Sequence, residues 1–209
     1  ILDKENNQII DFEAKVIDQN IGKYLHNDSI AIWFSDRQEL LGLPFKNSKV
    51  AIYSPEFTIL PDKTEKPAEV FRLLGFSDNE NLTYLKNKIS DTFYVYYALP
   101  DKTINYIENQ LPNVEFYCTD YGLLNFYNTK LSFKNYLALN IYGEELTICY
   151  KKDGSNHFYN KFPIKAKEDL LYYIRLSYEH LGLDLNEFPS ILYGFIEEKS
   201  PMYSTTYGY

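Results

Sequence analysis

The stretch from Tyr136 to Gly182 decides the fold, and it reads YLALNIYGEELTICYKKDGSNHFYNKFPIKAKEDLLYYIRLSYEHLG. Its first part alternates apolar and polar residues around two turns, one of them Asp153-Gly154, and Asp-Gly between alternating segments is a strong hairpin signal. Its last part repeats apolar residues at helical spacing over Lys167–Leu181 and ends at Gly182, a residue suited to a left-handed C-cap. The stretch therefore predicts three strands and an amphipathic helix. The strands are expected over Tyr136–Ile141, Glu145–Lys151 and His157–Ile164.

The two halves of the chain show similar orders of predicted elements. A further strand over Ile191–Ile196 and a helix from Ser200-Pro201, with Ser as cap and Pro in the first turn, complete the second half. The first half matches this order if one strand is missing before Ile1. We therefore expect an α/β fold of two similar βββαβα-type halves, residues 1–117 and residues 118–209. The first half is expected to contain strands over Ile1–Asp3, Ile9–Ile17, Lys49–Leu60 (interrupted by Pro55), Thr92–Leu99 and Val114–Cys118, and helices over Ile21–Leu41, Pro67–Leu74 and Lys102–Gln110. Asp101 is expected to cap the last of these, and Asp120 to cap the helix that opens the second half.

Composition and charge exclude several classes of function. The 209 residues are 45% hydrophobic and 24% charged, so the chain has the apolar residues that a folded core needs. Residues 1–117 carry 12 basic and 18 acidic side chains and residues 118–209 carry 9 and 11, which gives net charges of −6 and −2. Because neither half is basic, nucleic acid and anionic membrane surfaces are disfavoured partners. No apolar run approaches the ~18 residues of a membrane span, so no membrane insertion is expected.

The cysteines and histidines give no sign of a metal centre. Cys118 and Cys149 stand in separate hydrophobic segments, and two buried thiols in a reducing cytoplasm are favoured over a disulfide, which spacing alone does not decide. The three histidines are scattered, whereas a zinc site needs clustered ligands. The chain starts at Ile1 and not at Met, so we expect the natural N-terminus to lie upstream.

Tyrosine is the unusual component, with 21 Tyr and 14 Phe against one Met and one Trp. Tyr172 and Tyr173 are adjacent on the predicted helix, about 100° apart, so at least one of them is expected to reach a surface. Tyrosine is favoured at protein interfaces because it offers a large contact area at low entropic cost. A protein partner is therefore one interpretation, and aromatic thickening of small cores is the other.

Five segments carry a resemblance to known proteins: Ser54–Pro61, Tyr97–Pro100, Asp169–Asp184, Leu192–Glu197 and Ser200–Tyr203. They resemble a family of uncharacterised bacterial proteins, mostly from Bacteroidetes, that has the actin-like ATPase (ribonuclease H-like) fold. A three-stranded meander followed by helix, strand and helix, occurring twice, is also typical of that fold. The resemblance covers most of the chain and implies the architecture, but the family brings no assigned activity.

The resemblance to actin-like proteins implies three local devices that hold a nucleotide, of which two fall within this sequence. A phosphate-binding hairpin is expected near Asn140, which stands where Asp belongs, and Tyr142 takes the place of the first of its glycines, so that only Gly143 remains. Two glutamates follow Gly143 and would repel a triphosphate. An adenosine-binding Gly-Gly turn is expected at Gly194, but Phe195 replaces its second glycine.

The leading hypothesis is therefore a non-catalytic scaffold or protein-interaction protein that kept the fold and lost the nucleotide chemistry. It assigns no catalytic residue, no metal ligand and no cofactor. The alternative is an ATP-binding protein or weak ATPase in which Asn140, Gly143 and Gly194 contact ATP with Mg. In that case glycine would permit close approach of the backbone to the ligand. A small-molecule enzyme in the same cleft is a third possibility.

Overall fold

The computed structural model of the chain describes residues 2–3, 8–9, 34–42, 45, 47–61, 66–76, 81–91, 93–111, 113–131, 133–184 and 188–194. The chain divides into two compact units, unit 1 (Ile1–Asn125) and unit 2 (Phe126–Tyr209). The division falls within helix α5 (Thr119–Lys130), whereas the sequence places it after Tyr117. Most of the strand expected over 9–17, most of the helix expected over 21–41 and the helix expected from Ser200 lie outside the described residues.

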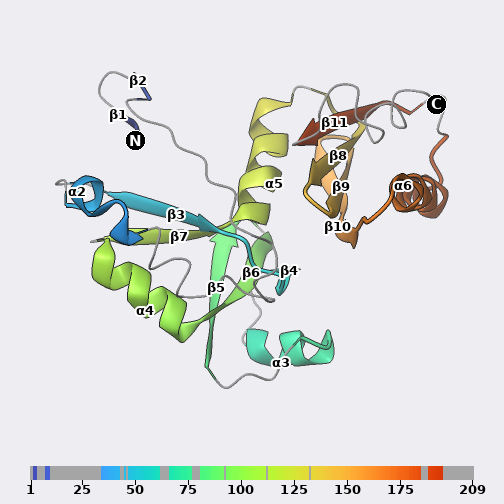
Figure 1. The fold of residues 1–209 in the computed structure, drawn as a ribbon. Helices are drawn as coiled ribbons and strands as arrows, with labels where there is room; N and C mark the ends of the chain where they lie inside the picture. Colours follow the sequence, from blue (N-terminus) through green and yellow to red (C-terminus); the bar gives the residue numbers. More distant parts are fainter. Residues whose placement is uncertain are drawn as a thin grey trace. The chain divides into compact units, whose positions relative to one another are not determined.

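The described part of unit 2 contains a four-stranded sheet with the order β10-β9-β8-β11 (Figure 1). β8 (Tyr136–Tyr142), β9 (Glu145–Lys152) and β10 (Ser155–Pro163) form an antiparallel meander. The chain then runs through α6 (Lys167–Leu181) to β11 (Ser190–Gly194), which pairs in parallel with β8. The predicted meander, helix and fourth strand are thus confirmed. Asp153 and Gly154 take φ angles of 50° and 82°, as an Asp-Gly hairpin turn requires.

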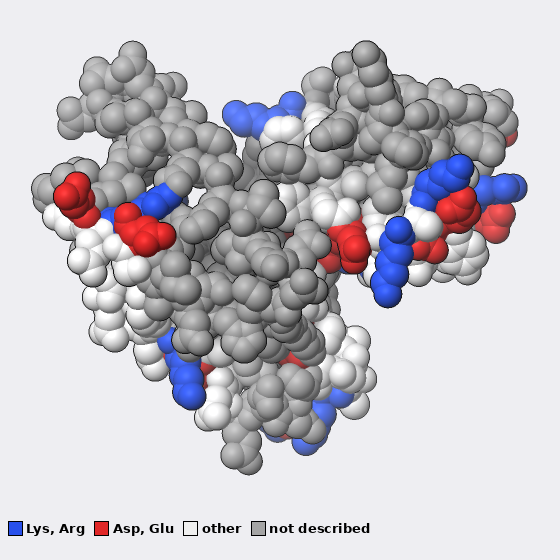
Figure 2. Space-filling view, viewed as in Figure 1, with Lys and Arg blue, Asp and Glu red and all other residues white. Residues whose placement is uncertain are grey.

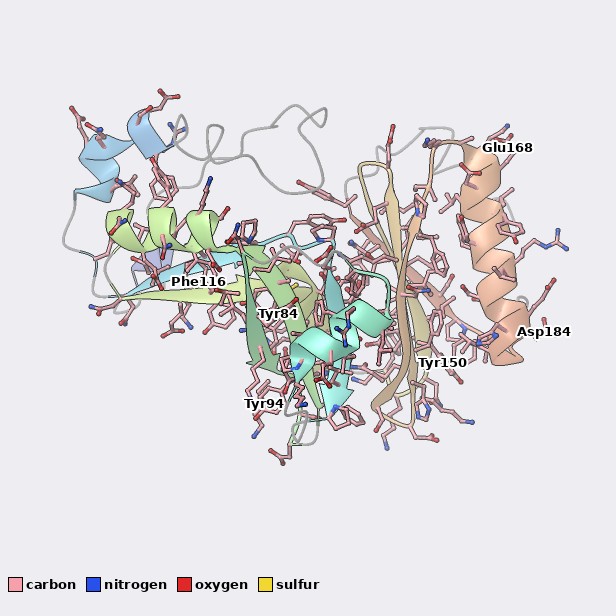
Figure 3. The ribbon with its side chains drawn as sticks, turned by 90° about the horizontal axis from the view of Figure 1, so that it is seen from below. Tyr84, Tyr94, Phe116, Tyr150, Glu168 and Asp184 are labelled. Atoms are coloured by element: carbon pink, nitrogen blue, oxygen red, sulfur yellow. The ribbon has the colours of Figure 1, made fainter. Side chains whose placement is uncertain are left out.

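Helix α6 covers one face of this sheet. Leu170, Ile174 and Tyr178 recur every four residues along α6 and pack against alternate residues of β8 and β9, among them Leu139. Figure 3 shows Tyr150 of β9 on the same side of the sheet. These contacts form the core of unit 2 because the strand period of two and the helix period of about 3.6 both place apolar residues on the shared interface.

The two adjacent tyrosines of α6 point to different surroundings, one to the core of unit 2 and one to solvent, as the sequence predicts. Tyr173 stacks on Phe162 of β10, with ring centroids 4.6 Å apart and an angle of 22° between the rings. Tyr172 is 60% exposed and lies on the outer side of the helix. One aromatic side chain therefore contributes to the core of unit 2 and its neighbour to the surface.

Both ends of α6 are closed by local hydrogen bonds or geometry. The carboxylate of Asp169 accepts the backbone N–H groups of Lys165 and Ala166 at 2.9 and 3.0 Å. Gly182 takes the left-handed conformation, with φ 65° and ψ 35°, and its N–H bonds back into the last turn. Gly182 is therefore the C-cap that the sequence predicts, because a left-handed residue costs glycine no steric strain.

The described part of unit 1 contains a parallel strand pair, a three-stranded antiparallel sheet and a short hairpin (Figure 1). β3 pairs in parallel with β7, and the antiparallel sheet has the order β4-β6-β5. The strands are β1 (Leu2–Asp3), β2 (Gln8–Ile9), β3 (Ser48–Ile52), β4 (Phe57–Pro61), β5 (Leu82–Lys88), β6 (Phe93–Pro100) and β7 (Val114–Cys118). The helices are α2 (Gln38–Leu41), α3 (Pro67–Leu73) and α4 (Asp101–Gln110).

Pro55 marks the place where the chain passes from one sheet to the other. The sequence predicts one strand over Lys49–Leu60 interrupted by Pro55, and the structure has β3 and β4 there, in different sheets. The hydroxyl of Ser54 lies 2.8 Å from the carbonyl of Glu56 and 2.9 Å from that of Ala98, which fixes the bend. Proline cannot donate to a ladder, so the strand ends where it stands.

Two small cores hold unit 1 together. Helix α4 packs on the β3–β7 pair through a cluster that includes Ile107 and has Phe116 packed against it, and Figure 3 shows Phe116 beneath α4. Phe71 of α3 packs on Tyr96 and Ala98 of β6. β6 is the central strand, and all five residues over 95–99 are buried because the strand has a neighbour on each edge and is covered on both faces.

Three details of unit 1 differ from the sequence-based expectation. Strand β5 was not predicted, because its alternation is masked by Lys86, Asn87 and Lys88. Asp101 is the first residue of α4 and not its N-cap, and its carboxylate accepts the hydroxyl of Thr83 at 2.6 Å. Asp120 is likewise inside α5, where its carboxylate accepts the thiol of Cys118 at 3.2 Å.

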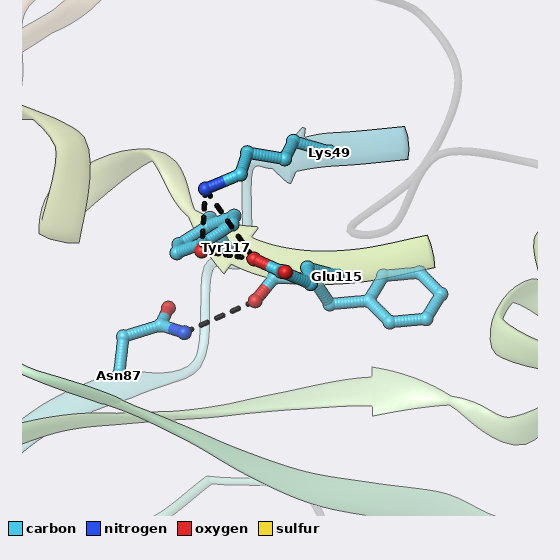
Figure 4. A network of polar contacts seen from close by, with 5 residues as sticks. Lys49, Asn87, Glu115 and Tyr117 are labelled. Carbon is cyan, nitrogen blue, oxygen red and sulfur yellow. Dashed lines mark hydrogen bonds and ion pairs between the residues drawn. The ribbon is translucent and has the colours of Figure 1, made fainter. Parts of the chain in front are cut away.

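The side chain of Asn87 joins β5 to the edge of β7 (Figure 4). Its amide nitrogen donates to the carbonyl of Phe116 at 3.0 Å, and its oxygen accepts the N–H of Cys118 at 2.9 Å. The carboxamide therefore supplies β7 with the hydrogen bonds that a neighbouring strand would otherwise supply. On the exposed face of the β3–β7 pair, Lys49 of β3 lies 3.4 Å from Glu115, the residue directly opposite on β7. Such an exposed ion pair adds little stability.

Replacing Asn87 by Leu should destabilise unit 1 by about 2–3 kcal/mol, because it leaves a partly buried carbonyl and N–H without partners. Asn87→Asp keeps the acceptor but turns a charged oxygen toward the carbonyl of Phe116, so it should also destabilise unit 1. Urea unfolding monitored by tyrosine fluorescence measures both, with Asn109→Ala on the exposed side of α4 as the matched control. Equal stability of Asn87→Leu and the parent would contradict a bridging role.

Replacing Asp169 by Ala should lower the melting temperature at neutral pH. The N–H groups of Lys165 and Ala166, in that order, hold the pKa of Asp169 below its ordinary value of 3.8. The stabilisation is therefore fully present above that ordinary value and is lost as the pH falls through the lowered pKa. Melting curves from pH 7 downward should show parent and variant converging in acid, while the exposed Glu168→Ala control shows no such trend. A gap that stays constant with pH would disprove the assignment.

Candidate functional site

The three residues singled out from the sequence gather at one end of the unit 2 sheet. Asn140 lies on β8, one residue before Ile141, which pairs with Gly194 at the end of β11. Gly143 lies in the turn between β8 and β9 with φ 58°. These positions meet because β8 and β11 are parallel neighbours, so their carboxyl ends lie at the same edge of the sheet.

Asn140 lies in a polar row that crosses the sheet on the face opposite α6. The register places Tyr193 of β11 beside it on one side and Thr147 of β9 on the other, with Lys161 of β10 beyond. Asn140 is half-buried and Thr147 is buried. The row offers hydroxyl, amide and ammonium groups at a single level, which is the kind of set that fixes the orientation of a polar ligand.

The sheet itself requires a residue without a side chain at position 194. Gly194 has φ 113°, and a Cβ built on it would lie 1.9 Å from the carbonyl oxygen of Ile141. The three nearest heavy atoms all belong to the backbone of Ile141. The close approach that glycine permits here is therefore between two strands of the protein.

The turn after β8 is acidic and exposed. Tyr142 is 63% exposed and Glu144 is also exposed. Glu145 lies 3.5 Å from the ammonium of Lys161, so its charge is partly compensated. The two glutamates thus differ: one is paired across the sheet, and the other projects into solvent beside Gly143.

The described residues contain no group of three or more His, Cys, Asp or Glu side chains that could hold a metal ion. Both cysteines are buried, and they are not joined by a disulfide. Burial raises the pKa of the Cys149 thiol to about 12, with Lys151 acting in the opposite direction. A thiol with that pKa is protonated at neutral pH and is a poor nucleophile.

A buried lysine in an aromatic surrounding was missed by the sequence analysis. Lys151 is 4% exposed, and its ammonium donates to the carbonyl of Tyr127 at 3.3 Å and lies 5.9 Å from the centre of the Tyr136 ring. The signal was present in the strand period, since Lys151 shares a face with Thr147 and Cys149. Its position next to a turn and beside Lys152 is also typical of exposed residues, so the local pattern does not reveal its burial.

The described surface carries both signs of charge. Figure 2 shows basic and acidic side chains interspersed on the face drawn, in keeping with the net charge of −8. Within the described segments, no helix is long and apolar enough to cross a membrane.

The architecture is an actin-like ATPase fold of the α/β class. A crystal structure from Bacteroides thetaiotaomicron, of a protein with an actin-like ATPase fold and unknown function, is similar with a TM-score of 0.82 and 18% sequence identity, over 99% of this chain and 81% of that chain. A structure of the PilM–PilN type IV pilus biogenesis complex is similar with a TM-score of 0.57 and 9% identity, over 93% of this chain and 77% of that chain. The chain belongs to the family described as "Protein of unknown function (DUF3822)", which matches residues 1–209. Comparison with curated proteins gives no significant match.

Two glycine substitutions should have opposite effects on stability. Gly194→Ala should destabilise unit 2 by about 1–3 kcal/mol from the positive φ alone, with a further loss from the contact with Ile141. Gly122→Ala, in α5, places its new Cβ in open space, with no packed neighbour within 4 Å, and should stabilise by about 0.5–1 kcal/mol. Thermal unfolding of both variants beside the parent checks this pair. A tolerated Gly194→Ala would show that β11 can move away from β8.

Proposed function

We propose that the protein is a non-catalytic scaffold or interaction protein built on the actin-like fold. The observation that carries this proposal is the packing at Gly194. The space that a side chain would take there is occupied by the backbone of Ile141 and is not open to a ligand. Asn140 replaces the aspartate that would hold a metal or its water, and Glu144 puts a negative charge beside Gly143. These features together remove the usual reasons to expect nucleotide chemistry at this end of the sheet.

The comparisons support a role in protein assembly. One of the similar structures is that of a complex between two proteins of type IV pilus biogenesis, so an actin-like fold of this kind occurs in a protein–protein complex. The exposed aromatic side chains of Tyr142 and Tyr172 supply contact area of the type found at interfaces. We propose a protein partner, and neither nucleic acid nor membrane insertion.

A cytoplasmic location is part of the proposal. Cys118 and Cys149 are both buried, and neither forms a disulfide within the described part of the chain. Free thiols persist in a reducing compartment, whereas paired cysteines are typical of oxidising ones.

The alternative, an ATP-binding protein or weak ATPase that binds ATP with Mg, is favoured by one observation. Asn140, Gly143 and Gly194 do lie together at the carboxyl ends of parallel strands, where α/β proteins commonly bind ligands. The two functions differ in whether nucleotide stabilises the fold.

Thermal unfolding of the full chain with and without millimolar Mg-ATP distinguishes them. A ligand at 100 times its dissociation constant stabilises by about 2.7 kcal/mol, which for a chain of this size raises the melting temperature by roughly 5–10 °C. We expect no shift with ATP, ADP or GTP. A shift that Asn140→Leu abolishes and the exposed Asn105→Leu control retains would overturn the scaffold proposal in favour of nucleotide binding.

A further inference from the structure

The ammonium group of Lys151 is buried in unit 2. The residue is 4% exposed, and its strand neighbour Lys152 is exposed. Within the described part of the chain, no Asp or Glu lies within ion-pair distance of Lys151. An ammonium taken out of water loses most of its solvation, so the surrounding groups must favour the charge strongly for the arrangement to persist.

The groups around Lys151 come from the C-terminal half of α5 and from β8. The ammonium donates to the carbonyl of Tyr127 at 3.3 Å, and the hydroxyl of Tyr136 donates to the same carbonyl at 3.0 Å. The Tyr136 ring presents its electron-rich system 5.9 Å from the ammonium. Burial raises the pKa of Tyr136, which keeps its hydroxyl protonated and able to donate.

The carbonyl that both side chains hold has a special place in α5. Tyr127 lies in the last turn of a helix that ends at Lys130, where the backbone dipoles sum to a partial negative charge. Lys151 therefore finds its counter-charge in the end of a helix. The rings of Phe126 and Tyr127 add contacts to Tyr193 of β11, with centroid distances of 5.6 and 6.0 Å.

The N-terminal half of α5 is fixed within unit 1 by different contacts. α5 follows β7 directly, and the ring of Tyr121 stacks on Tyr117 with centroids 5.5 Å apart. Leu124 is fully buried. The exposed Gly122 lies between Tyr121 and Leu124, within this N-terminal half, and lowers the helix propensity of the segment. The two halves of α5 are thus held by different sets of side chains.

We propose that Lys151 and Tyr136 form a latch that holds the C-terminal turn of α5 on the unit 2 sheet, so that this turn docks and releases as a two-state element. When the turn is docked, the ammonium is buried against the helix end. When it is released, the ammonium regains water and the helix end loses its cap. The latch thus couples the order of the segment that joins the two units to a single buried charge.

Hydrogen–deuterium exchange of the full chain tests the latch. In Lys151→Met, which keeps the length and apolar character of the stem, the amides of residues 126–131 should exchange about tenfold faster while those of β8 and β9 stay protected. Lys152→Met, one residue along the same strand, is the matched control and should leave both regions unchanged. Unchanged exchange of residues 126–131 in Lys151→Met would overturn the proposal, and so would equal acceleration across the whole of unit 2.

A second variant decides the matter if Lys151→Met does not fold. Tyr136→Phe removes only the hydroxyl, keeps the ring beside the ammonium and should accelerate exchange of residues 126–131 about threefold, again without loosening β8 and β9. Unaltered exchange in Tyr136→Phe would show that the shared carbonyl does not hold the helix end, and the latch would then be rejected.

Discussion

The carboxamide of Asn87 is the interaction on which the arrangement of unit 1 depends. β7 pairs with β3 along one edge, and along the other its Phe116 carbonyl and Cys118 N–H are bonded by a single side chain from β5. Buried backbone groups must find partners, and a full strand is not the only way to supply them. Because β5 belongs to the antiparallel sheet, this side chain sets how that sheet, with α3 on its face, meets the parallel pair and α4.

Unit 2 meets the same requirement with backbone alone. β8 is bonded to β9 on one edge and to β11 on the other, and Gly194 allows the last pairing to close on Ile141. The glycine is therefore explained by the sheet before any ligand is considered. The same geometry brings Asn140 and Gly143 to the edge where a ligand would bind, so the fold assembles the place for a site whether or not the chemistry is retained.

The parts of the fold that follow from local patterns were predictable. The helix over Lys167–Leu181 and the three strands before it could be predicted from the sequence. Their periodicity, the Asp153-Gly154 turn and the Gly182 cap each have a local physical cause. β5 was not predictable, since Asn87 is polar for a reason that lies on another strand. Lys151 was not, because its counter-charge is a helix end distant in the sequence. The three candidate residues were identified from sequence, but their shared position depends on the register between β8 and β11, which no local pattern contains.

The burial of β6 carries a hazard as well as a benefit. The residues over 95–99 read VYYAL, a run of high β-propensity without charge, and in the folded protein they lie between two strands and under Phe71. A chain that lost β4 or β5, by truncation or slow folding, would present this run as an open edge, the template from which cross-β aggregates grow. Asp91 before β6 and Pro100 at its end act as gatekeepers that keep the vulnerable window short.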